Sequence, residues 1–162
     1  MGDAMIKLLT SRSGAWILVG EIIFCVILGW FLQPVDVVAV HNDRDYSEVL
    51  VRHFPVTDKG KINWWYRNEL FLKSHYKMPN PGKDGLYEIT FWDFGDGYKE
   101  DDEYDRLCFD DMKTKLHCID KNYLFTVEND RYGNLLFSVN DGTYHTNKKG
   151  KLVKQKYEIN AY

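Results

Sequence analysis

The side chains best suited to chemistry in this chain lie in one acidic stretch, ITFWDFGDGYKEDDEYDRLCFDD, residues 89–111. Its tripeptide Asp93-Phe94-Gly95 matches the one that binds magnesium in protein kinases. A kinase also needs a glycine-rich loop, a strand lysine and a His-Arg-Asp loop, and the sequence has none of these. A calcium loop of the EF-hand type needs ligands at positions 1, 3 and 5, whereas Asp93 and Asp96 are three apart. We therefore expect no dedicated metal site and no cofactor, with generic binding of a divalent cation as the alternative.

Charge is segregated along the sequence. Residues 93–111 contain nine acidic and two basic residues, a net charge of −7, whereas the remainder, with 15 acidic and 19 basic residues, carries +4. One interpretation is a solvated hairpin loop, and the other is an acidic surface that attracts a protein partner with a basic surface. Gly95 and Gly97 would form its turn, and Phe94 or Tyr98 would provide an apolar anchor. The candidate partner-binding residues are Asp96, Glu100, Asp101, Asp102 and Glu103.

The pair Trp64-Trp65 is a second candidate for partner binding, because tryptophan is frequent in interaction hot spots. Neighbouring helix positions point about 100° apart, so only one of the two is expected in the core. The alternatives are that both are largely buried, or that one lies at a bilayer surface as an aromatic anchor.

Cys108 and Cys118 bracket nine residues, and in an oxidising compartment we expect them to form a disulfide. Free thiols are one alternative. A zinc site is another, but only His117 is adjacent, and the further ligands that zinc needs are missing at short spacing.

Two classes of function are disfavoured by composition and motif. The net charge of −3 and the isoelectric point near 5.9 give no basic footprint for nucleic acid. The five histidines are dispersed, and the common hydrolase, metalloprotease and nucleotide-binding motifs are missing from the sequence. We therefore expect a protein that is not an enzyme.

The N-terminal segment AWILVGEIIFCVILGWFL, residues 15–32, has Glu21 as its single charged residue. At about 1.5 Å per residue it reaches about 27 Å, close to the thickness of a bilayer core. This predicts an uncleaved transmembrane anchor, with a cleavable signal peptide as the alternative. Lys7 and Arg12 place the tail, residues 1–14, in the cytoplasm and residues 33–162 outside it. Glu21 either has a function in the membrane or lies near the cytoplasmic headgroups.

The exported part has the pattern of an α+β domain. Residues 35–40 and 48–54 alternate like strands, and residues 57–79 predict one helix, with Thr57 or Asp58 as its N-cap and Pro79 and Pro81 beyond its end. Its apolar face would contain Ile62, Trp65, Tyr66, Leu70, Leu72 and Tyr76. From residue 86 onward, strand-sized segments separated by turn residues predict an antiparallel meander packed on the helix.

Five stretches, PVDVVAV, FPVTDKGKINWW, ITFWDFGDGYKE, YDRLCFDDMKT and CIDKN, resemble an enterobacterial membrane-protein family of unknown function. The resemblance covers about residues 35–127 and implies a single-pass protein of the Gram-negative inner membrane with a periplasmic domain. It supplies no catalytic residues. We expect a non-catalytic, membrane-anchored binding module, in particular an immunity-type protein that neutralises a delivered antibacterial toxin. An envelope structural or housekeeping protein is the alternative, and an envelope hydrolase is the third.

Overall fold

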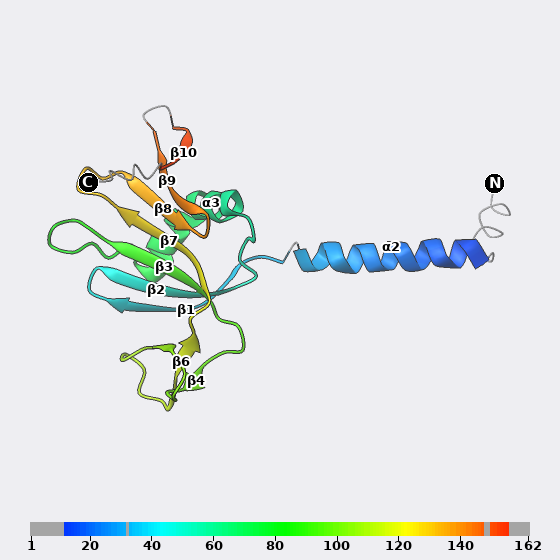
Figure 1. The fold of residues 1–162 in the computed structure, drawn as a ribbon, viewed down its shortest axis with the longest axis horizontal. Coiled ribbons are helices and arrows are strands. Elements are labelled where there is room, and N and C mark those ends of the chain that lie inside the picture. The colour runs from blue at the N-terminus through cyan, green and yellow to red at the C-terminus, as the bar shows by residue number, and fades with distance from the viewer. Residues whose placement is uncertain (1–11, 32, 148–149, 156–162) are drawn as a thin grey trace, which may run out of the picture. The chain divides into compact units, whose positions relative to one another are not determined.

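The structure is a computed structural model that describes residues 12–31, 33–147 and 150–155 (Figure 1). The chain divides into two compact units, Met1–Pro34 and Val35–Tyr162. Most of the tail predicted at residues 1–14, and Leu32 at the end of the predicted anchor, lie outside the described residues.

The first unit contains helix α2, Arg12–Phe31. The side chains described in it are exposed, among them Ile22, Phe24 and Val26. Among the residues that the structure describes, no helix is both long and apolar enough to cross a membrane. The transmembrane helix at residues 15–32 therefore stays a prediction.

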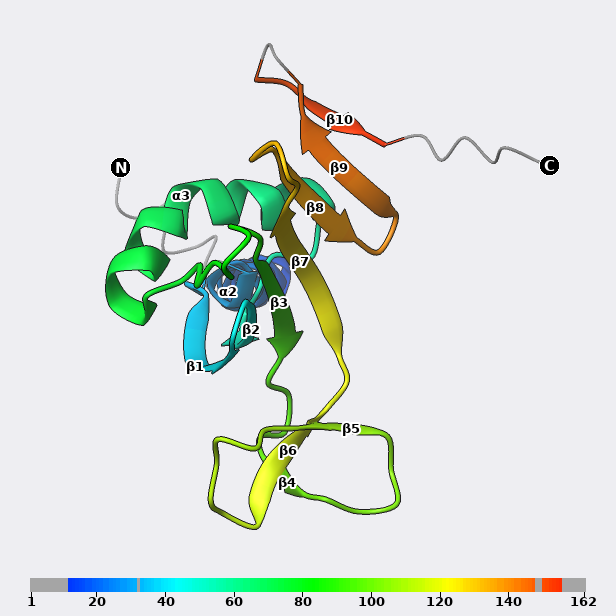
Figure 2. The same cartoon turned by 90° about the vertical axis from the view of Figure 1, so that its left-hand side faces the viewer.

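The second unit is built on a seven-stranded sheet with the order β1-β2-β3-β7-β8-β9-β10 (Figures 1 and 2). The predicted α+β class is confirmed, and the sheet is mostly antiparallel. Its strands are β1 (Asp36–Asp43), β2 (Tyr46–Arg52), β3 (Glu88–Asp93), β7 (Tyr123–Asn129), β8 (Leu135–Val139), β9 (Gly142–Thr146) and β10 (Leu152–Lys154).

The meander predicted from residue 86 onward does not include β5 (Arg106–Cys108), which pairs in a separate sheet, and one pairing of the main sheet lies outside that prediction. Strands β2 and β3 are parallel, and helix α3, Asp58–Tyr76, lies between them in the sequence. Parallel neighbours need a crossover connection, and a helix of 19 residues is long enough to provide it. The hairpin β1–β2 is thereby joined to the same sheet as the later strands.

Helix α3 has the predicted ends. The Thr57 hydroxyl accepts a hydrogen bond from the Gly60 N–H at 3.1 Å, which caps the first turn. Lys77 ends the helix in the left-handed conformation, with φ of 56°, and Pro79 follows.

The face that α3 packs on the sheet is narrower than the sequence predicts. Ile62, Trp65 and Leu72 are buried against Val49, Phe91, Phe125 and other sheet residues. Leu70 is 77% exposed and Tyr66 is 42% exposed, so both predictions of core residues are wrong. In place of an apolar side chain the core includes Lys61, whose ammonium donates to the Leu124 carbonyl at 2.7 Å.

Residues 94–122 form a lobe between β3 and β7, beyond one end of the main sheet (Figure 2). Its three strands pair in the order β4-β6-β5. A second, smaller core joins the lobe to the sheet face opposite α3, through Leu50, Phe94, Phe109 and Ile119. The strands are β4 (Lys99–Glu100), β5 (Arg106–Cys108) and β6 (Leu116–Asp120). The sequence predicts β5 but not β6.

Candidate functional site

A cleft of about 540 Å³ opens between the β1–β2 hairpin and residues 107–111 of the lobe. We call it the hairpin cleft. None of its described lining residues is a lysine or an arginine, whereas four are carboxylates and two are aromatic. Its lining is His41, Asn42, Asp43, Tyr46, Glu48, Leu107, Cys108, Phe109, Asp110 and Asp111.

His41 is the most tightly held polar side chain in this cleft. Its Nδ1 lies 2.9 and 2.8 Å from the two carboxylate oxygens of Asp111, and its Nε2 lies 2.9 Å from the Tyr98 hydroxyl. The ring stacks on Phe109, with 3.8 Å between the ring centres. Because a carboxylate only accepts, Nδ1 carries a proton, and in the neutral ring Nε2 then accepts from the Tyr98 O–H. His41 therefore fastens the lobe to strand β1.

The Tyr98 hydroxyl supports this assignment. Burial raises the pKa of Tyr98, and the nearby charge of Asp111 raises it further. The phenol therefore keeps its proton at neutral pH and remains a donor to His41.

Glu48 lies directly opposite His41 in the β1–β2 hairpin. One of its oxygens, Oε2, accepts a short hydrogen bond from the Trp92 indole N–H. Burial raises the pKa of Glu48, and this outweighs the lowering by the Trp92 hydrogen bond. The charge of Glu88 acts in the same direction as burial.

Two more carboxylates lie on this face of the sheet. Glu88 of β3 and Glu128 of β7 are directly opposite each other. Thr90 pairs with Glu48, and Thr90 is on the same face of β3 as Glu88 because the two are two residues apart. Glu48, Glu88 and Glu128 therefore share the sheet face away from α3. Burial raises the pKa of Glu128, and repulsion from Glu88 adds to it. Like charges placed directly opposite destabilise a sheet, so this arrangement has an energetic cost.

The sequence does not predict the hairpin cleft, although part of the signal is present in HNDRDYSE. Asp43 pairs with Tyr46, so Arg44 and Asp45 form a two-residue turn, and Arg44 has a φ of 56°. Counting outward from that turn places His41 opposite Glu48. The contact of His41 with Asp111 joins residues 70 positions apart, and no local pattern predicts it.

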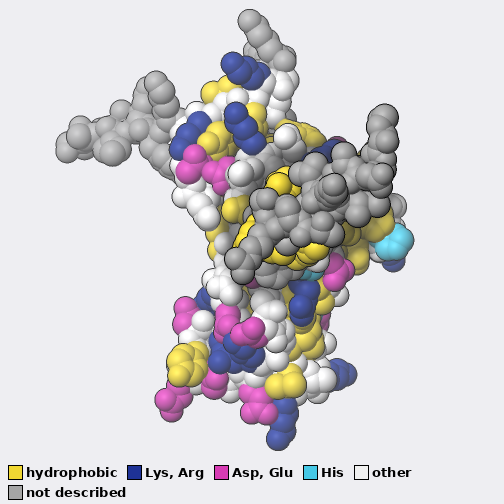
Figure 3. Space-filling view, turned by 90° about the vertical axis from the view of Figure 1, so that its right-hand side faces the viewer, with side chains coloured by type: hydrophobic (Ala, Val, Ile, Leu, Met, Phe, Trp, Pro, Cys, Tyr) yellow, Lys and Arg dark blue, Asp and Glu magenta, His cyan; other side chains and the backbone are white. Residues whose placement is uncertain are grey.

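The predicted acidic residues lie on the lobe, where acidic and basic side chains are interleaved (Figure 3). The structure divides them into two groups. Asp96 lies 3.8 Å from the Lys99 ammonium, and Asp102 lies 2.8 Å from the Arg106 guanidinium. The second group, Glu100, Asp101 and Glu103, is exposed and has no ion pair with any described residue.

The turn predicted at Gly95 and Gly97 is present, since both glycines have positive φ. The expectation that Phe94 would anchor a partner is wrong, whereas the same expectation for Tyr98 stays a prediction. Phe94 is 9% exposed and belongs to the second core, against which Tyr98 also packs. Both aromatic side chains hold the lobe to the sheet.

Trp65 is also excluded as a partner contact, because it is 2% exposed in the main core. Trp64 is half-buried, with its ring centre 5.0 Å from that of Phe54 and 5.7 Å from that of Phe91. Adjacent helix positions thus face different parts of one core, and partner binding by the half-buried Trp64 stays a prediction.

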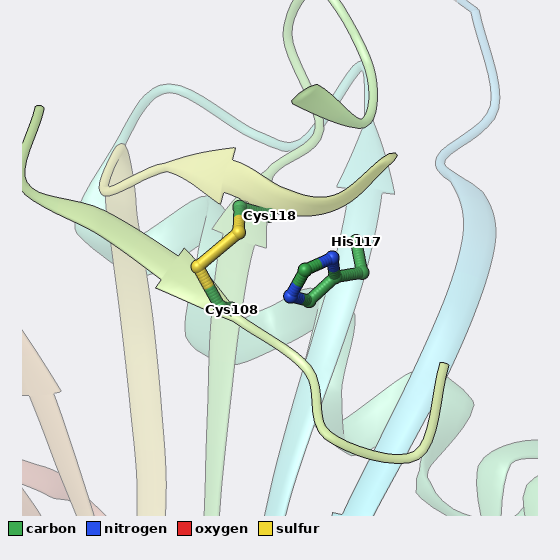
Figure 4. Close-up of side chains that lie close together, drawn as sticks. All are labelled: Cys108, His117 and Cys118. Atoms are coloured by element: carbon green, nitrogen blue, oxygen red, sulfur yellow. A yellow bond between two sulfur atoms is a disulfide. The ribbon is translucent and has the colours of Figure 1, made fainter. Parts of the chain in front are cut away.

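A disulfide joins Cys108 and Cys118, as predicted (Figure 4). The two residues are directly opposite in the β5–β6 pair. His117 lies beside the disulfide, and its ring nitrogen and the two sulfurs lie within 4.8 Å of one another. The sulfurs are bonded to each other and are not thiolates, so they are not the ligands that a structural zinc requires.

Glu21 is exposed on α2. Its proposed role in a membrane stays a prediction.

The fold and the hairpin cleft define a class of protein: a small α+β domain with one helix on its main sheet and a disulfide-bonded acidic lobe, preceded by a helical segment. The chain belongs to the family described as "Enterobacterial putative membrane protein (DUF943)", whose model matches residues 10–156. This confirms the resemblance seen in the sequence. Neither the curated proteins nor the solved structures contain a match to the chain.

Proposed function

We propose that this protein is a non-catalytic, membrane-anchored module that binds a protein partner with a basic surface. The observation that carries the proposal is the uncompensated charge of Glu100, Asp101 and Glu103. Neighbouring acidic residues of the lobe have basic partners within the chain, whereas these three are exposed and have none among the described residues. Exposed charge of one sign attracts a partner of the other sign and speeds its association.

The hairpin cleft supports binding better than catalysis. A general base needs a ring nitrogen free to accept a substrate proton, but both nitrogens of His41 have partners within the chain. The nearest strand serine, Ser47, is buried and donates to Asn42 at 2.7 Å, so it is not poised as a nucleophile.

Membrane anchorage rests on two observations: the family is described as a membrane protein, and residues 15–32 contain a single charge. Lys7 and Arg12 favour a cytoplasmic N-terminus, which would place the α+β domain in the periplasm of a Gram-negative cell. A cysteine at Gln155 should then react with a membrane-impermeant thiol reagent in cells with a permeabilised outer membrane, and a cysteine at Ser11 should not. The reverse labelling pattern would refute the orientation.

The specific form of this proposal is an immunity-type role, in which the domain blocks a toxin delivered into the periplasm or inner membrane. Blocking needs a complementary surface and no catalytic group, and a small anchored domain with segregated charge meets that need. Protection of cells that express the protein against a co-expressed toxin tests this role.

The general proposal is tested by crosslinking the full chain in its own membranes and capturing what it contacts. The variant Glu100→Gln/Asp101→Asn/Glu103→Gln removes three uncompensated charges from the lobe. Asp36→Asn/Glu69→Gln/Asp84→Asn is the matched control, because it removes the same charge elsewhere in the second unit. We expect the lobe variant to capture the partner about tenfold less well at about 50 mM salt, with little difference at about 500 mM.

Equal capture by both variants would refute the lobe as the recognition surface. If the full chain captures only envelope structural proteins, the structural or housekeeping alternative is favoured. Release of peptidoglycan fragments or lipid products by the purified chain would establish the hydrolase alternative.

A further inference from the structure

The hairpin cleft contains a hydrogen-bond acceptor that no described group of the chain satisfies. Glu48 uses Oε2 to accept from the Trp92 indole, whereas Oε1 has no hydrogen-bond partner among the described residues. The side chain is half-buried and its pKa is raised by burial, so its charge is poorly solvated. A bound donor with a positive charge would stabilise the ionised form.

Two other carboxylates of the cleft are also available to a positively charged hydrogen-bond donor. Asp111 is occupied by His41, but Asp110 has no ion pair with a described residue. Asp43 has only its sequence neighbour Arg44, at 3.9 Å, and both of these side chains are almost fully exposed. Hydrogen-bond acceptors therefore lie on two sides of the cleft, on the β1–β2 hairpin and on the lobe.

The position of these acceptors on two sides of the cleft argues for an extended cation and against a metal ion. Among the described residues, the one group of three potential ligand atoms close enough to share an ion is Cys108, His117 and Cys118. The carboxylates of the cleft are thus too far apart to form a metal cage. A guanidinium can bridge separated carboxylates and can also stack on an aromatic ring such as Tyr46, which is 50% exposed at the cleft.

We propose that the hairpin cleft binds the side chain of an arginine presented by the protein partner, with Glu48 and Asp110 as its acceptors. The identification of a protein as the source of this arginine rests on the proposed function. The acidic lobe would attract the basic surface of the partner over a long range, and the cleft would hold one of its side chains. Both features involve the lobe, because Asp110 of the cleft directly follows strand β5 and the Phe109 that comes after it.

The test uses the full chain in detergent micelles, with tryptophan indoles labelled for NMR and Nα-acetyl-arginine amide as the probe. The Trp92 indole N–H reports on Glu48 directly, because it donates to that carboxylate. We expect its signal to shift with a millimolar Kd, the usual range for a ligand of about 15 non-hydrogen atoms. Nα-acetyl-citrulline amide has nearly the same shape without the charge and should cause no shift.

Glu48→Gln should weaken the binding of the arginine amide about tenfold, and Asp110→Asn should weaken it as well. Glutamine still accepts from Trp92, and unchanged indole signals of Trp64 and Trp65 at the main core show that the free variant keeps the fold. Asp36→Asn, at the start of strand β1 and outside the lining of the cleft, is the control and should leave the Kd unchanged.

Three results would overturn the inference: citrulline amide binding as well as arginine amide, an unchanged Kd in Glu48→Gln, or a larger shift with about 5 mM calcium than with the arginine amide. The probe is a small molecule, so its result is independent of partner capture. If the arginine amide fails to bind while the lobe variant loses the partner, only the cleft inference is wrong. If the arginine amide binds while the full chain captures no protein, the cleft binds cations and the proposed function is wrong.

Discussion

Removal of the Cys108–Cys118 disulfide should loosen the lobe far more than the main sheet. The disulfide closes a loop between residues separated by 10 positions. In the loop-entropy relation, a loop of about 11 residues restricts the unfolded chain by about 9 cal/mol/K, which is about 3 kcal/mol at 25 °C. The variant Cys108→Ser/Cys118→Ser should lose this contribution.

The loss should fall on the lobe because its hydrophobic core is small. The second core has four buried side chains, of which Phe94, Phe109 and Ile119 come from the lobe and Leu50 from the sheet. The main core has twelve buried side chains and helix α3. A lobe that depends so much on one covalent link can open while the main sheet stays folded.

Hydrogen exchange measured on the full chain in detergent micelles distinguishes these regions. The Phe109 amide donates to the His117 carbonyl at 3.0 Å, and we expect it to exchange about a hundredfold faster in the double variant, the equivalent of about 3 kcal/mol. Amides in the β3–β7 ladder should keep their rates. A reductant should have the same effect on the wild-type chain and none on the variant.

The reasoning would be refuted if both the reductant and the double substitution left exchange in the lobe unchanged. Loss of protection in β3 and β7 by the same factor would show that the lobe does not open by itself. If mass spectrometry found free thiols at both positions in the purified chain, the disulfide on which this prediction depends would be missing.

Three further predictions concern charges and buried polar groups. Glu128→Gln should raise the free energy of unfolding by about 0.2–1 kcal/mol near pH 7, because it removes repulsion from Glu88. The folded-state pKa of Glu128 is raised above its usual 4.5, so ionised Glu128 lowers the free energy of unfolding increasingly as pH rises through the folded-state pKa. If urea unfolding showed the same stability gain for Glu128→Gln at pH 7 and at about pH 4, this explanation would be contradicted. Lys61→Met should lower the free energy of unfolding by about 1 kcal/mol, because the Leu124 carbonyl loses its donor, and an unchanged urea midpoint would count against that role. His41→Ala should lower it by about 1.5–3 kcal/mol through loss of a hydrogen bond to a carboxylate, and retention of the wild-type melting temperature would show that this bond does not hold the lobe.

The parts of the fold predicted from sequence are those specified by local chemistry. Thr57 caps α3, and the polar and glycine-rich turns at residues 44–45 and 140–142 separate paired strands. Alternation of apolar residues in β7 and β8 identifies them as strands, because each has one face on the core. The close pair Cys108 and Cys118 was enough to predict the disulfide.

The parts that sequence did not predict depend on contacts between distant residues. The parallel pairing of β2 with β3 depends on how α3 crosses the sheet, which helical periodicity alone does not specify. Lys61 was not expected in the core, because its burial requires the carbonyl of Leu124, 63 residues away. The hairpin cleft needs both the turn at Arg44 and the return of residues 107–111 to the outer face of the sheet. Secondary-structure propensity and residue spacing do not predict that residues 107–111 fold back onto the sheet.

The central claim, that the acidic lobe and the hairpin cleft form a recognition surface, is tested most directly by site-specific photo-crosslinking in cells. A photoreactive phenylalanine analogue replaces Tyr46 at the cleft, Tyr104 on the lobe, or Tyr132 in the β7–β8 turn, which are 50%, 75% and 91% exposed. We expect one discrete protein adduct from Tyr46 and from Tyr104, which is lost in Glu100→Gln/Asp101→Asn/Glu103→Gln, and no such adduct from Tyr132. Adducts from Tyr132 alone, or adducts from all three positions that persist in the charge variant, would contradict it.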